Sequence, residues 1–490
     1  MQKIGQPTIE ISTLPELQYE LPLKATLRPY QEQGIARGME LRRVMIGDEQ
    51  GLGKTLQSIG TVVGIEAALK QNAFPCLVIC PSSTKINWKR EWEKFSNKKA
   101  MVLDDKSKNT WHQYWNIGMI DVFIVNYESL KKFFVLSMPE VKKGQPFRST
   151  DIQMKSTIDL FKSVIVDESQ RCKDATTLQS KLVLRICHQK ENVICLSGTP
   201  VVNKPADLFP QLAIMGHAGT FGGKKHFLDR YCEGGRGANN LKELNFLLNK
   251  HCFFRREKKD VAKDLPEKTR RGIICDITNR DEYDRMRVNA ERELAAMGLS
   301  LEDIKSFKNA EAIQLVMKLM AISAKGKIEA AKEYIDSVVE CGEKIIVFCR
   351  TIETVSTLKK IYPKAVTVTG SDDMQTRQKH IDSFQNDPNC LVIIVNHKAG
   401  GVGITLTAAS REVFVEWPWT YSDCVQCEDR AHRIGQKNNV DVAYLIGKDT
   451  VDEDRYEAVM EKMHIGNTIT GATDRMEMEM IDKTSNLFNS

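Results

Sequence analysis

Short apolar runs that end in polar turns recur through the first half of the chain and again through the second. The runs cover residues 44–46, 77–80, 122–125, 164–166 and 193–196, and later residues 344–349, 365–369, 391–395 and 412–416. Helical patterns lie between them, such as Trp88, Trp92 and Phe95 on one face. This alternation is typical of parallel sheets covered by helices on both faces. The pattern therefore predicts an α/β chain with two parallel sheets.

A charged stretch with helical spacing, from about residue 281 to 340, separates the two series of strands. A chain of 490 residues is too long for a single hydrophobic core, which agrees with more than one packed domain. We expect a leading segment at residues 1–22, a first lobe at 23–265, a second lobe at 266–464 and a polar tail at 465–490. Ligands in such sheets gather at the carboxyl ends of the strands, where the polar turns would lie.

A glycine-containing loop, residues 48–55 with the sequence DEQGLGKT, follows the first apolar run and precedes a helical pattern. A strand, a glycine loop and a helix start together direct backbone N–H groups at phosphate oxygens. Lys54 is expected to contact the β- and γ-phosphates, and the Thr55 hydroxyl to hold Mg²⁺. Asp48 departs from the P-loop pattern, which has a glycine at this place, so the loop alone would also fit an ordinary turn. The loop residues assigned to the nucleotide are Gln50, Gly51, Leu52, Gly53, Lys54 and Thr55.

Two carboxylates, Asp167 and Glu168, follow the apolar run 164–166. In isolation this pair would be a solvated acidic turn after a strand. Together with the phosphate loop it indicates an NTPase, in which Asp167 holds Mg²⁺ and Glu168 orients or deprotonates the attacking water.

The second half adds residues 426–436, with the sequence QCEDRAHRIGQ. If this stretch is helical, Gln426, Arg430 and Arg433 share one face, because residues three and four apart are neighbours. The two arginines could form surface ion pairs with the acidic residues beside them, or act as arginine fingers toward a γ-phosphate. The glycine-rich residues 396–407 could likewise be a flexible turn or a backbone-lined anion site.

Composition narrows the class of protein only a little. Lysine and arginine total 70 against 64 for aspartate and glutamate, a net charge of +6, which permits a polyanionic partner without demonstrating one. No stretch approaches the ~20 apolar residues of a membrane helix, and the start of the chain lacks the apolar core of a signal peptide. The 13 cysteines are scattered, and Cys424 and Cys427 are interpreted as helix-face residues rather than zinc ligands. We expect no membrane association and an intracellular, reducing compartment, either the cytoplasm of a bacterium or infected cell, or a nucleus.

Eight ordered motifs carry a family resemblance. They are Gln31, DEQGLGKT, ICPSS, VDESQ, LSGTP, VFCR, AGGVGITLT and QCEDRAHRIGQ. In this order they strongly resemble the Swi/Snf-type ATPases of helicase superfamily two, over about Leu23 to His464. Residues 254–261 are similar to the end of that family's first lobe, and residues 414–429 are most similar to its compact annealing-helicase branch. Gln170 departs from the family, which usually has His at this place.

The resemblance implies two RecA-like lobes, each a parallel sheet flanked by helices, with a helical insert between them, and ATP and Mg²⁺ as cofactors. Gln31 would contact the adenine, and Asp167 and Glu168 would serve the metal and the water. From the second lobe, the residues that would complete the site are Gly403, Gln426, Arg430 and Arg433. The residues in motifs that tend to face DNA are Ser82, Trp88, Asn126, Thr199, Arg350, Ser371, Asn396 and Lys398.

The function that follows from this resemblance is a DNA-dependent ATPase. We expect it to couple ATP hydrolysis between its lobes to movement along double-stranded or branched DNA, as a monomeric motor for which a targeting protein subunit is a candidate partner. One alternative is a strand-separating helicase that acts on DNA or RNA. Another is a nucleic-acid-gated ATPase switch subunit, in which ATP controls binding without translocation.

Overall fold

The computed structural model describes residues 14–140, 145, 147–201, 204–235, 237–300, 310–397, 404–418, 420–470 and 479–482. These residues form two compact units. The first unit is built from the described residues within Met1–Val261 and Ile465–Thr473, and the second from those within Ala262–His464 and Asp474–Ser490.

The first unit contains a seven-stranded parallel sheet with the order β3-β4-β2-β7-β8-β1-β9. The strands are β1 (Arg43–Ile46), β2 (Cys76–Cys80), β3 (Ala100–Val102), β4 (Val122–Asn126), β7 (Ser163–Asp167), β8 (Asn192–Leu196) and β9 (Phe253–Phe254). A separate antiparallel pair joins β5 (Val135–Ser137) to β6 (Gln153–Met154). Since neighbouring strands run in the same direction, the loops after β1, β7 and β8 lie at one edge of the sheet.

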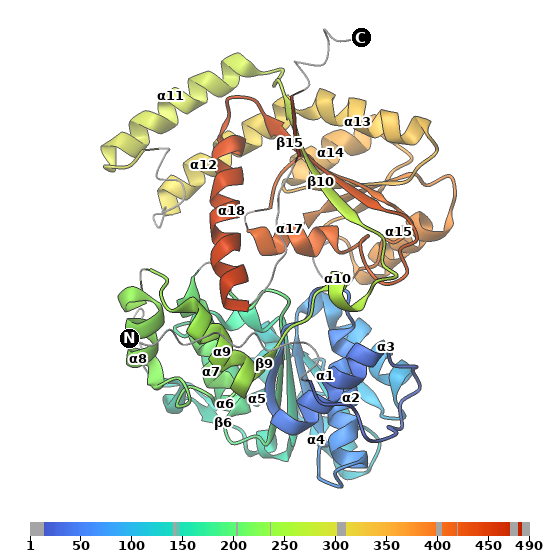
Figure 1. Ribbon diagram of the computed structural model, residues 1–490, viewed down its shortest axis with the longest axis vertical. Helices are drawn as coiled ribbons and strands as arrows, with labels where there is room; N and C mark the ends of the chain where they lie inside the picture. The colour runs from blue at the N-terminus through green and yellow to red at the C-terminus, as the bar shows by residue number, and fades with distance from the viewer. Residues whose placement is uncertain are drawn as a thin grey trace, which may run out of the picture. The chain divides into compact units, whose positions relative to one another are not determined.

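Helices cover both faces of this sheet, which explains why its strands are continuous apolar runs. The helices are α1 (Pro29–Leu41), α2 (Lys54–Ala67), α3 (Lys85–Phe95), α4 (Trp111–Asn116), α5 (Leu130–Phe134), α6 (Leu178–Cys187), α7 (Phe209–Ile214), α8 (Gly223–Tyr231), α9 (Leu241–His251) and α10 (Lys258–Val261). Helices α1, α2 and α3 lie on one face of the sheet and α5 to α9 on the other (Figure 1). Alternate strand residues enter these opposite cores: Val78 packs on the first face, whereas Leu77 and Ile79 pack on the second.

The second unit repeats this architecture with a parallel sheet of order β12-β13-β11-β14-β15-β10-β16. Its strands are β10 (Lys268–Cys275), β11 (Ile345–Cys349), β12 (Val366–Val368), β13 (Val392–Asn396), β14 (Arg411–Phe414), β15 (Val440–Gly447) and β16 (Glu479–Asp482). Its helices include α13 (Ile328–Glu340), α14 (Ile352–Ile361), α15 (Met374–Asn386) and α17 (Tyr421–Glu428). Ile345 and Val347 pack with α13 and α14 on one face, and Ile346 and Phe348 pack with α15 and α17 on the other.

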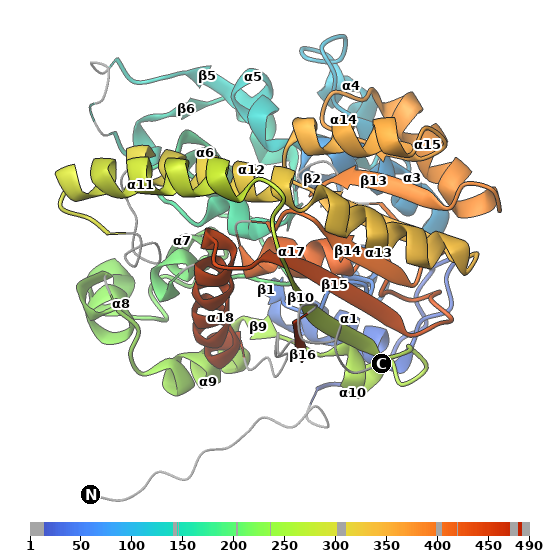
Figure 2. The same ribbon diagram turned by 90° about the horizontal axis from the view of Figure 1, so that it is seen from above.

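The charged helical stretch forms α11 (Arg280–Ala296) and α12 (Ala310–Gly326), which follow β10. The two helices pack together around Tyr283, Leu294 and Leu315 in a small core of their own (Figures 1 and 2). The chain continues after β15 as α18 (Val451–Thr470). The prediction of two parallel sheets flanked by helices, with a helical insert, is therefore confirmed. None of the helices among the described residues has the length and apolar character needed to cross a membrane.

Candidate nucleotide site

The loop between β1 and α2 has the backbone of a phosphate cradle. Gly51 and Gly53 adopt positive φ angles of 85° and 77°, and α2 begins directly afterwards at Lys54. A Cβ atom at Gly53 would lie 2.6 Å from Nε2 of Gln31, so a larger residue would strain the backbone and meet that amide. Thr55 lies in the first turn of α2, where the helix N-terminus favours anions.

Lys54 lies across this loop. Its Nζ donates to the Asp48 carbonyl oxygen at 2.8 Å and to the Glu49 carbonyl oxygen at 3.3 Å. Burial lowers the pKa of Lys54, and the negative charges of Glu168, Asp48 and Asp167 act against that shift. The structure thus places the lysine cation close to both members of the predicted acidic pair.

Gln31, from α1, also reaches the loop. Its Nε2 donates to the Leu52 carbonyl oxygen at 3.3 Å, and its Oε1 accepts from the Arg28 backbone N–H at 3.0 Å. The Tyr30 hydroxyl donates to the same Leu52 oxygen at 3.2 Å. Gln31 is therefore held beside the loop, where a residue that contacts the nucleotide base would have to lie. Gln50 extends the other way and lies against Gly198, at the end of β8.

The acidic pair ends β7, which is separated from β1 by β8 alone. Asp167 accepts a hydrogen bond at Oδ2 from the Trp88 indole N–H at 2.8 Å. Burial, and to a smaller extent the negative charge of Glu168, raise the pKa of Asp167 to about 7. A carboxylate whose ionised form is disfavoured by burial and by a neighbouring like charge would be stabilised by a bound divalent cation.

Glu168 adopts a left-handed backbone conformation, with φ 53° and ψ 51°. Its Oε2 accepts a hydrogen bond from Gln170 Nε2 at 2.5 Å. Gln170, the residue that departs from the family pattern, thus holds the carboxylate predicted to orient water. Among the described residues, no three His, Cys, Asp or Glu side chains form a metal cluster. An ion at Asp167 and Thr55 would therefore need phosphate or water oxygens as further ligands.

In the second unit, Arg430 and Arg433 converge on one point. The Nη1 atoms of the two side chains donate to the Ile404 carbonyl oxygen at 3.4 and 3.3 Å. The expectation that they share a helix face with Gln426 is wrong, because α17 ends at Glu428 and both arginines lie in the turns that follow. The Leu406 backbone N–H donates to the Arg430 carbonyl oxygen at 2.9 Å, so this carbonyl bonds to a segment outside the helix.

The acidic residues beside these arginines have strong partners elsewhere. Glu428 is fully buried and accepts from Arg270 Nε and Nη2, both at 2.7 Å, and from Lys268 Nζ at 2.8 Å. Lys268 also lies 3.5 Å from Asp429. Arg430 is itself only 7 % exposed, so it is not a surface arginine. Gln426 lies on α17 and is buried with it. Gly403 lies outside the described residues.

Comparison with known proteins decides the family. The model of the SNF2-related domain matches residues 30–326, and that of the helicase conserved C-terminal domain matches residues 326–435. The chain belongs to the SNF2-related family. It is a helicase-like ATPase with two RecA-like lobes, and its relatives include annealing helicases, as the eight motifs predicted.

Two curated relatives illustrate this SNF2-related membership. The human DNA annealing helicase and endonuclease ZRANB3 is 30% identical over 493 residues, which cover 94% of this chain and 42% of that protein. A Caenorhabditis elegans homologue of SWI/SNF-related matrix-associated actin-dependent regulator of chromatin subfamily A-like protein 1 is 29% identical, with coverage of 91% and 62%. The chain thus spans about half the length of these relatives. A solved Sulfolobus solfataricus SWI2/SNF2 ATPase core in complex with dsDNA is 24% identical, with coverage of 93% and 96% and a TM-score of 0.44.

The residues expected to face DNA in this SNF2-related chain differ from one another in how exposed their side chains are. Trp88 requires a correction: its side chain is 2 % exposed and its indole N–H binds Asp167, so it packs in the core beneath the acidic pair. Ser82 and Ser371 are exposed, as a contact to DNA would need. The amides of Asn126 and Asn396 are buried and donate at 2.8 Å to Glu128 and to the Arg350 carbonyl oxygen. Thr199 and Arg350 are half-buried, and Lys398 lies outside the described residues.

Sequence reasoning missed Arg255 and Arg256, which follow β9. Arg255 Nη1 donates to the Gly47 and Gly198 carbonyl oxygens at 2.8 and 2.7 Å, and so joins the ends of β1 and β8. Arg256 pairs with Asp48 at 2.5 Å, and the side chains of both residues are fully buried. The signal that could have found this pair is Asp48 itself, a carboxylate where the P-loop pattern has glycine and therefore in need of a buried cation.

Proposed function

We propose that this SNF2-related protein is a DNA-dependent ATPase that converts ATP hydrolysis into movement along double-stranded or branched DNA. The observation that carries the ATPase assignment is the glycine loop at the start of α2, with Lys54 lying across it and with Asp167 and Glu168 at the end of β7, on the same carboxyl edge of the sheet. A lysine and two carboxylates at the carboxyl edge of a parallel sheet are the groups that phosphoryl transfer requires.

The residues of the first unit divide the work as follows. Lys54 and the loop N–H groups bind the phosphates, and Gln31 contacts the base. Thr55 and Asp167 fit Mg²⁺, since both offer hard oxygen ligands, and the bound ion would neutralise charge on the transferred phosphoryl group. Glu168, held by Gln170 at 2.5 Å, orients a water and accepts its proton.

We further propose that Arg430 and Arg433 of the second unit add positive charge to the transition state of the nucleotide held by the first unit. Their convergence on the Ile404 carbonyl oxygen supports a shared role. Guanidinium groups suit this task because they stay charged and present several N–H donors in a plane.

The DNA assignment is supported by the family and by its relatives, which include DNA annealing helicases. The net charge of +6 is compatible with a polyanionic track. Contacts that are mainly to phosphate would favour no particular base sequence.

The test is ATP turnover measured without nucleic acid, and with single-stranded DNA, duplex DNA, branched DNA and RNA. Duplex and branched DNA should stimulate most, and turnover should rise with duplex length. Displacement of a triplex-forming strand from the duplex should accompany this ATP turnover. Preferential stimulation by RNA, or separation of the duplex strands, would support the strand-separating alternative. Turnover that is independent of duplex length would support the switch, and turnover that ignores all nucleic acids would contradict the proposal.

A further inference from the structure

The segment that follows β9, residues 255–258, is bonded along the start of the phosphate loop. The Gly47 backbone N–H donates to the Phe254 carbonyl oxygen at 2.8 Å, and the Glu49 N–H donates to the Arg256 carbonyl oxygen at 3.0 Å. The Lys258 backbone N–H donates to Glu49 Oε2 at 2.7 Å. These bonds extend the pairing of β1 with β9 into the loop itself, so the loop is supported along its backbone.

The Arg256 side chain adds a buried ionic network to this support. Its Nε donates to Asp48 Oδ1 at 3.0 Å and its Nη2 to Asp48 Oδ2 at 2.5 Å. Nη2 also donates to Gln57 Oε1 at 2.6 Å, and Nη1 donates to the Tyr30 carbonyl oxygen. Gln57 Nε2 returns a bond to Asp48 Oδ2 at 2.9 Å and another to the Leu52 carbonyl oxygen at 3.3 Å. Arg256 is 1 % exposed, and Asp48 and Gln57 are 0 % exposed.

This network joins the three segments that carry the proposed nucleotide-binding groups of the first unit, namely α1, the phosphate loop and α2. Tyr30 precedes Gln31 in α1, Asp48 and Leu52 belong to the loop, and Gln57 belongs to α2. Asp48 has a double role, because its carboxylate is fixed by Arg256 while its carbonyl oxygen accepts from Lys54. A displacement of the guanidinium would therefore move the loop, the lysine and the start of α1 together.

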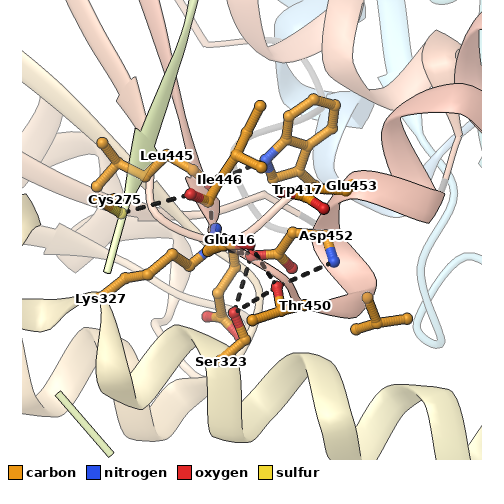
Figure 3. A network of polar contacts seen from close by, with 12 residues as sticks. Cys275, Ser323, Lys327, Glu416, Trp417, Leu445, Ile446, Thr450, Asp452 and Glu453 are labelled. Atoms are coloured by element: carbon orange, nitrogen blue, oxygen red, sulfur yellow. Dashed lines mark hydrogen bonds and ion pairs between the residues drawn. The ribbon is translucent and has the colours of Figure 1, made fainter. Parts of the chain in front are cut away.

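A second buried ion pair serves as a comparison, because it has a similar geometry but lies outside the candidate nucleotide site. Lys327 and Asp452 lie 2.7 Å apart in the second unit, and their side chains are 1% and 3% exposed (Figure 3). Ser323 Oγ and the Gly447 N–H also donate to Asp452 Oδ2, at 2.9 and 3.1 Å. The partners of this pair tie α12, β15 and α18 together, so it is a matched structural pair.

We propose that Arg256, acting through Asp48 and Gln57, is a positioning residue for ATP that fixes the phosphate loop and the Gln31 end of α1 relative to each other. The inference rests on the proposed function, since it assigns a role in binding the same nucleotide. Binding groups must be held to about 0.5 Å by supporting contacts. A cradle that contacts the phosphates equally in the ground and transition states changes KM more than kcat when it is disturbed.

Two variants disturb the network without removing a charge. Arg256→Lys keeps the cation but loses the planar fork that binds both Asp48 oxygens. Gly34→Ala places a Cβ atom 2.0 Å from Gln57 Oε1 and 2.6 Å from Arg256 Nη2, so it displaces both side chains from α1. The matched controls are Lys327→Arg at the structural pair, and Gly38→Ala one turn further along α1, where the new Cβ would instead meet Thr61 Oγ1 at 2.5 Å.

The experiment titrates the full-length chain with a fluorescent N-methylanthraniloyl ATP and records the thermal midpoint and the DNA-stimulated KM and kcat. Arg256→Lys and Gly34→Ala should raise Kd and KM about tenfold and leave kcat within about threefold. The two controls should change the thermal midpoint but leave Kd unchanged. If Arg256→Lys does not fold, Gly34→Ala against Gly38→Ala decides the question.

The inference fails if the network variants lower the thermal midpoint as the controls do while Kd stays at the wild-type value. It also fails if the controls raise Kd as much as the network variants. Nucleotide binding by the wild-type protein distinguishes these results from a failure of the proposed function. If the wild type does not bind the nucleotide at all, the ATPase assignment itself is wrong, whatever the variants do.

Discussion

Two carboxylates, one half-buried in the first unit and one fully buried in the second, have pKa values that move in opposite directions. At Asp167 of the first unit, burial and the charge of Glu168 raise the pKa to about 7. At Glu428 of the second unit burial also acts to raise the pKa, but Arg270 and Lys268 outweigh it and lower the pKa to about 2. The acid in the first unit lacks sufficient positive charge from the protein, whereas the one in the second has it in excess.

This difference separates a carboxylate that serves chemistry from one that serves structure. A carboxylate whose ionised form is disfavoured is ready to bind a cation, and such perturbed groups cluster at functional sites. A carboxylate surrounded by cations and by the Tyr444 hydroxyl at 2.7 Å holds its neighbours in place. On this view Glu428 fixes the end of α17, from which the chain continues to Arg430 and Arg433.

The largest expected effect tests whether the second unit takes part in chemistry. Arg430→Ala and Arg433→Ala should each lower DNA-stimulated turnover by about 10³-fold, the lower end of the range for arginine fingers, because two arginines share the charge. Nucleotide affinity should stay at the wild-type value, since the binding residues lie in the first unit. The control is Arg411→Ala, a half-exposed arginine of the second unit that pairs with Glu343 at 2.7 Å. Near-normal turnover in both arginine variants would leave the second unit a purely structural role.

The next effect concerns the acidic pair of the first unit. Glu168→Gln should slow turnover by about 10²-fold, the lower end of the range for a general base, because an amide cannot accept the proton of the attacking water. ATP binding should remain, since Lys54 and the loop are unchanged. Single-turnover hydrolysis and nucleotide titration measure the two properties separately. Glu128→Gln, at a half-exposed acid after β4, is the control, and equal losses in the two variants would reject Glu168 as the base.

The sequence predicted most of the strands that are buried on both faces and the polar turns that follow them, but it missed β15 (Val440–Gly447), whose eight residues are all buried. It did not predict β10, because this strand begins with Lys268 and Arg270, and charges are not typical of a buried strand. Their partner Glu428 lies 158 positions from Arg270 in the chain, so no local pattern reveals the pair. The same limit applies to the contact of Arg256 with Asp48 across 208 positions.

The family motif misplaced Trp88, and helical periodicity misplaced Arg430 and Arg433. Trp88 belongs to a motif that tends to face DNA, yet its indole N–H satisfies Asp167 in the interior. The helical spacing of Arg430 and Arg433 is real in the sequence, but the Leu406 N–H takes the Arg430 carbonyl and the helix ends at Glu428. In both cases a distant partner, absent from the local pattern, determines where the side chain lies.

A third prediction concerns the neutralised acid. Glu428→Gln should destabilise the protein by about 3–5 kcal/mol at pH 7, because it leaves Arg270 and Lys268 buried with a neutral partner. The pKa of Glu428 is lowered on folding, so its contribution is fully present above the unfolded pKa of 4.5 and is lost as the pH falls toward about 2. Urea unfolding of wild type and variant between pH 3 and pH 7 should show the two curves approach each other at low pH.

The control for this measurement is Glu343→Gln, at an ion pair whose side chains are 36% and 42% exposed. That change should cost at most ~1 kcal/mol. If Glu428→Gln were no more destabilising than Glu343→Gln, the contrast drawn between Asp167 and Glu428 would not describe their energetics.

The smallest expected effect concerns Gln170, which holds the proposed catalytic base Glu168 in the first unit. Gln170 Nε2 donates to Glu168 Oε2 at 2.5 Å, and a hydrogen bond to a charged group contributes about 1.5–3 kcal/mol. Gln170→Ala should therefore lower kcat by about tenfold, the lower end of that range, with KM unchanged, because the amide orients the base and does not contact the nucleotide. Gln179→Ala is the control, since this half-buried amide donates to the Arg171 carbonyl oxygen at 3.1 Å and has no assigned role in the site. In the Glu168→Gln background the base is already absent, so Gln170→Ala should have no further effect on kcat. A loss of the same size in both backgrounds would show that Gln170 acts on folding or on another group, and Glu168 would then be held by its strained backbone alone.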